Sequence, residues 1–198
     1  MAKLLYQGHG SYRITSNDGM VIYIDPFAGK GYDVPADLIL VTHEHHDHNV
    51  VDKMPHAPGC TVIRARDALK GGVYGSFEVG KTLIQTVQAY NKNHPKDECV
   101  GFVLTVDGVK VYAAGDTSET EDMRTRLPQM KLDYALLPGD GFFNMGVEEA
   151  SRCAGLIGAK HSIPIHLKPG GLYSERKAAR FQAEGKLLVR PGETIGLS

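Results

Sequence analysis

The segment Thr42–Asn49, THEHHDHN, places four histidines, one glutamate and one aspartate within six consecutive positions. Imidazole nitrogens and carboxylate oxygens are good ligands for zinc, iron and manganese. His43 and His45 are two residues apart, so both can point at one ion from an extended turn. Asp47 and His48 are expected at the start of a short helix, from which they would point at a neighbouring position. The spacing therefore favours two adjacent metal ions over one.

The alternative interpretation of this segment is a solvated, histidine-rich loop. We disfavour it because the histidines directly follow an apolar run, LILVT, and are interleaved with acidic residues. Within the segment, His46 does not fit the ligand spacing and is expected to face solvent.

Acidic or imidazole side chains also stand at the ends of other apolar runs, at Asp25, Asp116, Asp140 and His166. In layered α/β proteins, functional side chains gather at such strand ends. Asp116 closes the run VYAAGD, and its two carboxylate oxygens suit a position between two cations. Taken alone, a Gly-Asp-Thr stretch is more typical of a helix cap or a turn.

The elements that must position these side chains are mostly short strands, each closed by a turn signal such as Asp107-Gly108. Three helices are predicted, over residues 65–70, 147–157 and 174–185. Strands are predicted over residues 4–7, 11–15, 20–25, 38–42, 60–65, 77–79, 82–90, 101–107, 110–116, 133–138, 162–166 and 186–190. The pattern indicates an α/β (α+β) protein with two similar halves, in each of which strands are followed by a helix.

Length and composition limit the classes of function. With 198 residues and 42% hydrophobic content, the chain is expected to form one domain over residues 1–198. Its 22 basic and 23 acidic side chains leave no broad cationic surface, which disfavours nucleic acid as a partner. The chain contains no apolar run of membrane-spanning length and no export signal, so we expect no membrane association and a cytoplasmic location. The three cysteines, Cys60, Cys99 and Cys153, are widely spaced and predict no disulfide framework.

The pattern His43-x-His45-x-Asp47-His48 resembles the signature of the metallo-β-lactamase superfamily. The stretches GHGSYRI, VIYIDPFAG, AAGDT and IPIH resemble the other motifs of that superfamily. The segments QAYN and LLPGDGFFNMGVEEA resemble the small metal-dependent hydrolases near ascorbate-6-phosphate lactonase. The resemblance covers nearly the whole chain and implies a four-layer αββα sandwich with the metals at one edge of its two sheets.

The resemblance also implies a role for individual residues. The first metal would be held by His43, His45 and His94, and the second by Asp47, His48 and His166, with Asp116 bridging the two. His94 stands before Pro95 in a polar loop, so Asn91 is left open as its competitor.

Other residues are expected to support the centre. Asp25 is expected to orient a ligand histidine through a hydrogen bond. Asp47 and His9 are the candidate catalytic residues; His9 would be a proton donor or a substrate contact, with a structural turn histidine as the equal alternative. Lys168 could contact an anionic group, although a solvated lysine is the simpler interpretation.

The expected chemistry is hydrolysis by a metal-activated hydroxide at a dinuclear site. Two divalent ions about 3.5–4 Å apart can share a water and lower its pKa from 15.7 to about 7. The expected ions are Zn²⁺, with Mn²⁺, Fe²⁺ and Ni²⁺ as alternatives, and the expected substrate is a small, anionic ester, lactone or phosphodiester. The competing hypotheses are a di-iron protein that reduces oxygen or nitric oxide and a non-catalytic metal-stabilised binding protein. A homo-oligomer is left open.

Overall fold

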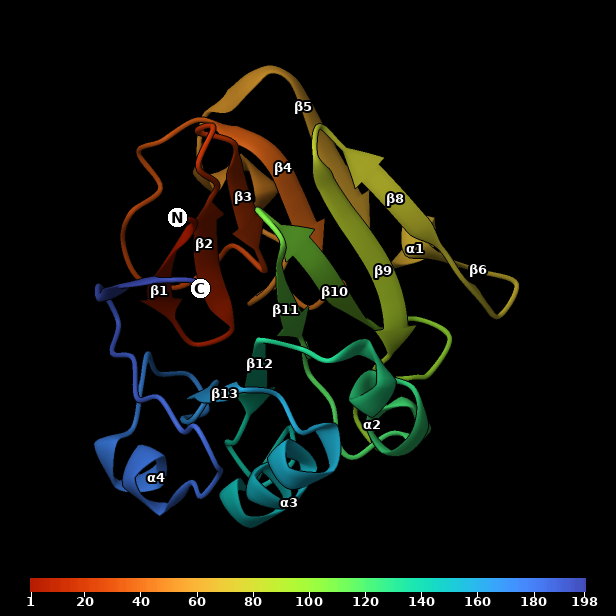
Figure 1. The fold of residues 1–198 in the computed structure, drawn as a ribbon, viewed down its shortest axis with the longest axis vertical. Coiled ribbons are helices and arrows are strands. Elements are labelled where there is room, and N and C mark those ends of the chain that lie inside the picture. Colours follow the sequence, from red (N-terminus) through yellow and green to blue (C-terminus); the bar gives the residue numbers. More distant parts are fainter.

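Two six-stranded mixed sheets pack face to face in the computed structural model, which describes all residues from 1 to 198 (Figure 1). The first sheet has the order β14-β1-β2-β3-β4-β5 and the second the order β13-β12-β11-β10-β9-β8. The two ends of the chain lie side by side, because β14 pairs antiparallel with β1.

The elements have the following bounds. The first sheet contains β1 (Lys3–Gly8), β2 (Ser11–Thr15), β3 (Val21–Ile24), β4 (Ala36–Val41), β5 (His56–Arg64) and β14 (Thr194–Gly196). The second contains β8 (Ser76–Val79), β9 (Thr82–Gln88), β10 (Val100–Val106), β11 (Val109–Ala113), β12 (Tyr134–Pro138) and β13 (His161–Ile165), and a small ribbon pairs β6 (Leu69–Lys70) with β7 (Val73–Tyr74). The helices are α1 (Ala65–Ala68), α2 (Glu121–Thr125), α3 (Val147–Ile157) and α4 (Glu175–Arg180), with 3₁₀ turns η1 (Val51–Lys53) and η2 (Leu127–Met130).

The main core fills the space between the two sheets. Along β10, Phe102 and Leu104 point into this space, whereas Val103 packs on the opposite face of the sheet. Along β4, Leu38 and Leu40 likewise point inward. Because successive strand residues face opposite sides, a strand that is buried on both faces requires a continuous apolar run, as these two have.

Replacing Phe102 with alanine is expected to lower the free energy of unfolding by about 3–5 kcal/mol. Phe102 is 0% exposed, so truncation both removes buried apolar area and leaves a cavity between the sheets. Phe142 is 65% exposed, and Phe142→Ala is the matched control, expected to change stability by less than about 0.5 kcal/mol. Urea titration of both variants measures the difference, and equal midpoints would contradict this description of the core.

The outer face of the second sheet is covered by helices. Residues of α2, α3 and α4, which lie together on one side of the molecule, pack on this face in a second apolar cluster (Figure 1). The outer face of the first sheet carries a smaller cluster, around Tyr23 and Ile39, that is covered by η1 and the loop of residues 26–35. The predicted α/β sandwich is confirmed, and its fourth layer is this loop and 3₁₀ turn instead of an α-helix.

Several predicted boundaries are right and others are wrong. Helix α3 has the predicted limits, and both residues of the Asp107-Gly108 turn adopt positive φ, as a tight hairpin requires. The predicted helix over 174–185 ends at Arg180, where Phe181 becomes extended. Residues 186–190 form no strand and make only a single bridge through Lys186. The chain instead closes with β14.

Strand direction brings the functional segments to one edge. β3 and β4 run parallel, as do β11, β12 and β13, so their carboxyl ends meet at the same edge of each sheet. β1 and β9 run in the same directions as these strands because each is separated from them by one antiparallel neighbour. No helix combines the length and the apolar content needed to cross a membrane.

Candidate metal centre

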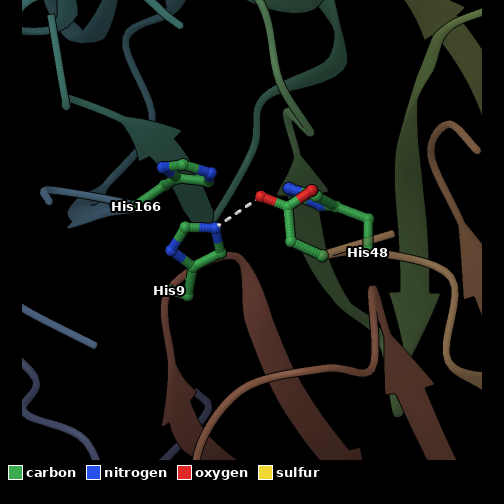
Figure 2. Close-up of side chains that lie close together, drawn as sticks. His9, His48 and His166 are labelled. Atoms are coloured by element: carbon green, nitrogen blue, oxygen red, sulfur yellow. Dashed lines mark hydrogen bonds and ion pairs between the residues drawn. The ribbon is translucent and has the colours of Figure 1, made fainter. Parts of the chain in front are cut away.

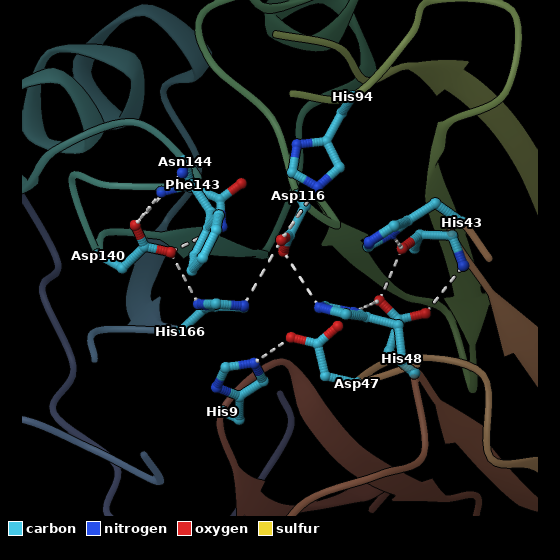
Figure 3. A network of polar contacts seen from close by, with 12 residues as sticks. His9, His43, Asp47, His48, His94, Asp116, Asp140, Phe143, Asn144 and His166 are labelled. Carbon is cyan, nitrogen blue, oxygen red and sulfur yellow. Dashed lines mark hydrogen bonds and ion pairs between the residues drawn. The ribbon is translucent and has the colours of Figure 1, made fainter. Parts of the chain in front are cut away.

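The side chains predicted to bind metal converge at this shared edge of the two sheets (Figure 3). His43, His45, Asp47 and His48 follow β4, and His94 follows β9. Asp116 and His166 follow β11 and β13. Residues 46–48 form a turn and not the start of a helix, and the following η1 begins only at Val51, which corrects the expectation for Asp47 and His48.

Three groups of potential ligands lie within the centre; a group of Asp25, His43 and His48 shares its histidines with two others, which hold the predicted ligand sets. In one group, ligand atoms of His43, His45 and His94 all lie within 4.8 Å of one another. In the other, the same is true of His9, Asp47, His48 and His166. These groups match the two expected sets, except that His9 joins the second one.

Asp116 lies between the two groups. Its Oδ1 is 3.4 Å from Nε2 of His48, and its Oδ2 is 3.4 Å from Nε2 of His94 and 3.5 Å from Nε2 of His166 (Figure 3). Asp116 is 4% exposed. It therefore faces histidines of both groups at once.

The histidines around Asp116 direct unpartnered nitrogens at a common centre. The Nε2 atoms of His43, His48, His94 and His166 are buried and make no hydrogen bond. Buried polar atoms without partners are rare and energetically unfavourable. Such a set, with a carboxylate among them, fits divalent cations well, because imidazole nitrogen and carboxylate oxygen are their usual ligands.

The other ring nitrogen of each of these histidines faces an oxygen that can orient the ring. Nδ1 of His48 lies 2.9 Å from Asp25 Oδ2, and Nδ1 of His94 lies 2.9 Å from Asn91 Oδ1. An N–H on Nδ1 would leave the lone pair of Nε2 free to point inward. The predicted contact between Asp25 and a histidine of this cluster is confirmed, and the role of that histidine as a ligand stays a prediction.

His166 is oriented by Asp140, whose role the sequence did not reveal. Nδ1 of His166 lies 3.0 Å from Asp140 Oδ2, although the ring is not ideally aligned for a hydrogen bond. Asp140 Oδ1 accepts backbone N–H bonds from Phe142, Phe143 and Asn144, which fix the carboxylate in place. The strand-end position of Asp140 was the only signal for this role.

Replacing Asp140 with asparagine is expected to lower metal affinity about 10–100-fold. Asparagine can keep the backbone bonds through its carbonyl, but its amide would then face Nδ1 of His166. Asp133 is a largely buried carboxylate that accepts from Lys110 N at 2.8 Å, away from the centre, so Asp133→Asn is the control. Competition with a chromophoric zinc chelator measures the zinc affinity of both variants. If Asp140→Asn binds zinc as tightly as Asp133→Asn, a role for Asp140 is contradicted.

Asn91, the competitor of His94, contacts the histidine instead of the centre. Its Oδ1 accepts from Asn93 N and faces His94 Nδ1, while its Nδ2 donates to Phe143 O. His94 itself is 1% exposed. The geometry thus supports His94 as the ligand and Asn91 as the group that holds it.

Backbone conformation also directs side chains into the centre. His9, Asp25 and His166 have φ of 55°, 46° and 45°, and only Asp107 and Lys131 are other non-glycine residues with positive φ. This conformation is unfavourable for residues with a Cβ and is concentrated at functional sites. The backbone also packs closely on the centre, since a Cβ on Gly10 would lie only 2.6 Å from Cε1 of His48.

The charges of the centre are strongly coupled. Burial lowers the pKa of His43 well below its usual range, and His48 adds to that effect. Burial would also lower the pKa of His48, but the nearby Asp116 and Asp25 raise it to about 9. Burial alone would raise the pKa of Asp116, yet His48 and His166 hold it well below the ordinary value. Asp116 is therefore an anion among imidazoles.

His9 belongs to the second group of potential ligands. Its Nε2 is 3.1 Å from Asp47 Oδ2, and its Nδ1 is 3.2 Å from Gly171 O. Figure 2 shows its ring lying against that of His166, with ring centroids 3.6 Å apart. His9 is 2% exposed and lies within the centre, and it also stands in the turn between β1 and β2.

Two other candidates lie outside the centre. The side chain of His46 is 91% exposed, as expected from its position outside the ligand spacing. Lys168 is also exposed, which agrees with a solvated lysine. Cys60, Cys99 and Cys153 are free, as predicted.

Comparisons with known proteins agree with this geometry. Residues 3–166 match the family model described as beta-lactamase superfamily domain. A curated protein of Thermococcus onnurineus, named UPF0173 metal-dependent hydrolase, is 32% identical, and the alignment covers 100% of both chains. A crystal structure of a candidate metal-dependent hydrolase from Parabacteroides distasonis superposes with a TM-score of 0.77 at 27% identity, covering 95% of this chain and 92% of that one. A metallo hydrolase of Ignicoccus hospitalis has the same fold, with a TM-score of 0.73 at 22% identity over 98% of this chain and 97% of its own.

Proposed function

This chain belongs to the beta-lactamase superfamily and is a metal-dependent hydrolase, and we propose that it uses two divalent metal ions to cleave an ester, lactone or phosphodiester bond of a small, anionic substrate. The observation that carries the proposal is the set of four buried, unpartnered Nε2 atoms around Asp116. A structural site for a single ion would not need two such groups of ligands on either side of one carboxylate.

The proposed ligand sets follow the two groups. His43, His45 and His94 would hold one ion, and Asp47, His48 and His166 the other, with Asp116 between them. When bound, such a pair of ions lowers the pKa of a shared water toward about 7 and polarises the bond to be cleaved. Zinc is the proposed ion, because nitrogen-rich sets with carboxylate suit it.

Asp47 and His9 are the proposed catalytic residues. Asp47 Oδ2 and His9 Nε2 are 3.1 Å apart, so a proton can be held between them beside the second group. Burial would raise the pKa of Asp47, but the hydrogen bond from His9 and the nearby His48 hold it well below the ordinary value. Asp47 therefore remains a carboxylate, and His9 is placed to give its proton to a leaving group.

A cavity of about 310 Å³ beside His43 and His45 supports a small substrate. Arg66 lines this cavity and forms no ion pair, whereas Arg64 is bound to Glu44. Asp97 and Glu98 also line it. The net charge of the wall therefore does not attract anions, and an anionic group would have to be held by Arg66 together with the ions.

The experiment is a hydrolysis screen on zinc-loaded and manganese-loaded protein. Its probes are p-nitrophenyl esters, simple lactones and bis(p-nitrophenyl) phosphate, with the His48→Ala variant in parallel. We expect turnover of one class by the wild type and its loss in the variant. Equal inactivity, or equal activity, of the two proteins toward every class would overturn the proposal. A visible absorption spectrum of iron-loaded protein tests the di-iron alternative separately.

A further inference from the structure

The carboxylate of Asp25 reaches both groups of histidines. Its Oδ2 lies 2.9 Å from Nδ1 of His48, in the second group, and 2.7 Å from Oγ1 of Thr42. Its Oδ1 accepts from the backbone N of Thr42 at 2.8 Å. Thr42 Oγ1 in turn lies 3.0 Å from Nδ1 of His43, in the first group. A continuous chain of contacts therefore runs from His48 through Asp25 and Thr42 to His43.

The direction of the bonds in this chain is fixed by the number of protons. A threonine hydroxyl has one proton to donate. The 2.7 Å contact with a carboxylate requires that proton, because two bare oxygens would repel each other. The hydroxyl can then only accept from His43, so Nδ1 of His43 must carry the N–H. Nε2 of His43 is left with its lone pair, and it is one of the buried unpartnered nitrogens.

Packing holds the hydroxyl in this position. Thr42 is 1% exposed, and its backbone O accepts from Val100 N at 2.9 Å. A Cβ on Gly115 would lie 2.8 Å from both Cβ and Oγ1 of Thr42. Gly115, with φ of 64°, thus lets the segment that carries Asp116 pack directly on the threonine side chain. The hydroxyl has little space for another rotamer.

We propose that Thr42 is a positioning residue that fixes the tautomer of His43 and makes it depend on the same carboxylate that orients His48. One buried carboxylate, that of Asp25, then prepares a ligand for each of the two ions. This inference rests on the proposed function only in naming the two histidines as metal ligands. The tautomer itself is a property of the metal-free protein.

Long-range ¹H–¹⁵N spectra of the metal-free protein test the tautomer directly. We expect the N–H of His43 on Nδ1 in the wild type and in Thr42→Ser, which keeps the hydroxyl. In Thr42→Val, which keeps the shape but removes the hydroxyl, we expect the Nε2–H form to appear. Loss of the signals in His43→Asn assigns them. An Nε2–H tautomer in the wild type, or an unchanged tautomer in Thr42→Val, would overturn the proposal.

Zinc affinity tests the consequence for binding. In a His166→Ala background only the first group is complete, and in a His45→Ala background only the second. Thr42→Val should lower the zinc affinity about 10–100-fold in the first background and less than about threefold in the second. Thr42→Ser should bind zinc nearly as tightly as its parent in both backgrounds. Equal effects in the two backgrounds would overturn it. If not even the wild type binds zinc, the proposed function fails, and the tautomer spectra still decide this inference.

Discussion

The Asp116→Ala variant is expected to lose hydrolytic activity by at least about 10³-fold, which corresponds to about 4 kcal/mol of transition-state stabilisation. Asp116 is the carboxylate that faces histidines of both groups, through contacts of 3.4 Å to His48 and 3.4 Å to His94. Without it, the proposed ions would lose the ligand between them, and the two groups of histidines would lose the one carboxylate that faces both. The loss should therefore exceed that caused by any residue that only orients a ligand.

Activity on the substrate class found in the screen, together with metal content, measures this effect. Asp116→Asn removes the charge but keeps the shape, and it should lose most of the activity while remaining folded by circular dichroism. His46→Ala lies within the same histidine-rich segment, but its side chain is 91% exposed, so it should retain full activity. Wild-type activity in the folded Asp116→Ala variant would show that the carboxylate has no part in catalysis.

Removal of metal with a chelator is expected to lower the melting temperature by roughly 5–10 °C for each ion lost. Free metal at 100 times its dissociation constant stabilises the folded state by about 2.7 kcal/mol. For a chain of this size, each 1 kcal/mol shifts the melting temperature by about 2–4 °C. Crowding of the imidazoles, which Asp116 and Asp25 offset only in part in the metal-free protein, also favours the metal-bound state.

Differential scanning calorimetry with and without chelator, followed by zinc addition, checks this prediction. The shift should be reversed by zinc and should be smaller in the Asp116→Ala variant, which is its internal control. A melting temperature that responds neither to chelator nor to zinc would mean that the folded state gains nothing from ions.

Much of the centre could be predicted because its residues follow strands. His43 comes directly after a continuous apolar run, and such a run indicates a strand buried on both faces. Asp116 and His166 follow similar runs, and the carboxyl ends of parallel strands share an edge. The types of residue and their positions at strand ends therefore indicated His43, Asp116 and His166, whereas His94 and the division into two ligand sets came from the resemblance to the superfamily. Their role as metal ligands stays a prediction.

What could not be predicted depends on contacts between distant segments. Asp140 orients His166 across 26 residues of sequence, a contact that no local spacing reveals. Asn91 lies only three residues from His94, but its spacing alone does not distinguish a ligand from a residue that orients one. The helix over 174–185 was predicted too long, because the pattern is helical but Phe181 is buried in the core in an extended conformation. Helix α2 was missed because it has only five residues, and its cap, Thr120, resembles an ordinary turn residue.

The most direct test of the central claim is a crystal structure of the zinc-loaded protein with anomalous diffraction measured above and below the zinc edge. Our account predicts two anomalous peaks on either side of Asp116, one contacted by His43, His45 and His94 and the other by Asp47, His48 and His166. A single peak, peaks elsewhere, or no peak in protein that was loaded with excess zinc would contradict it.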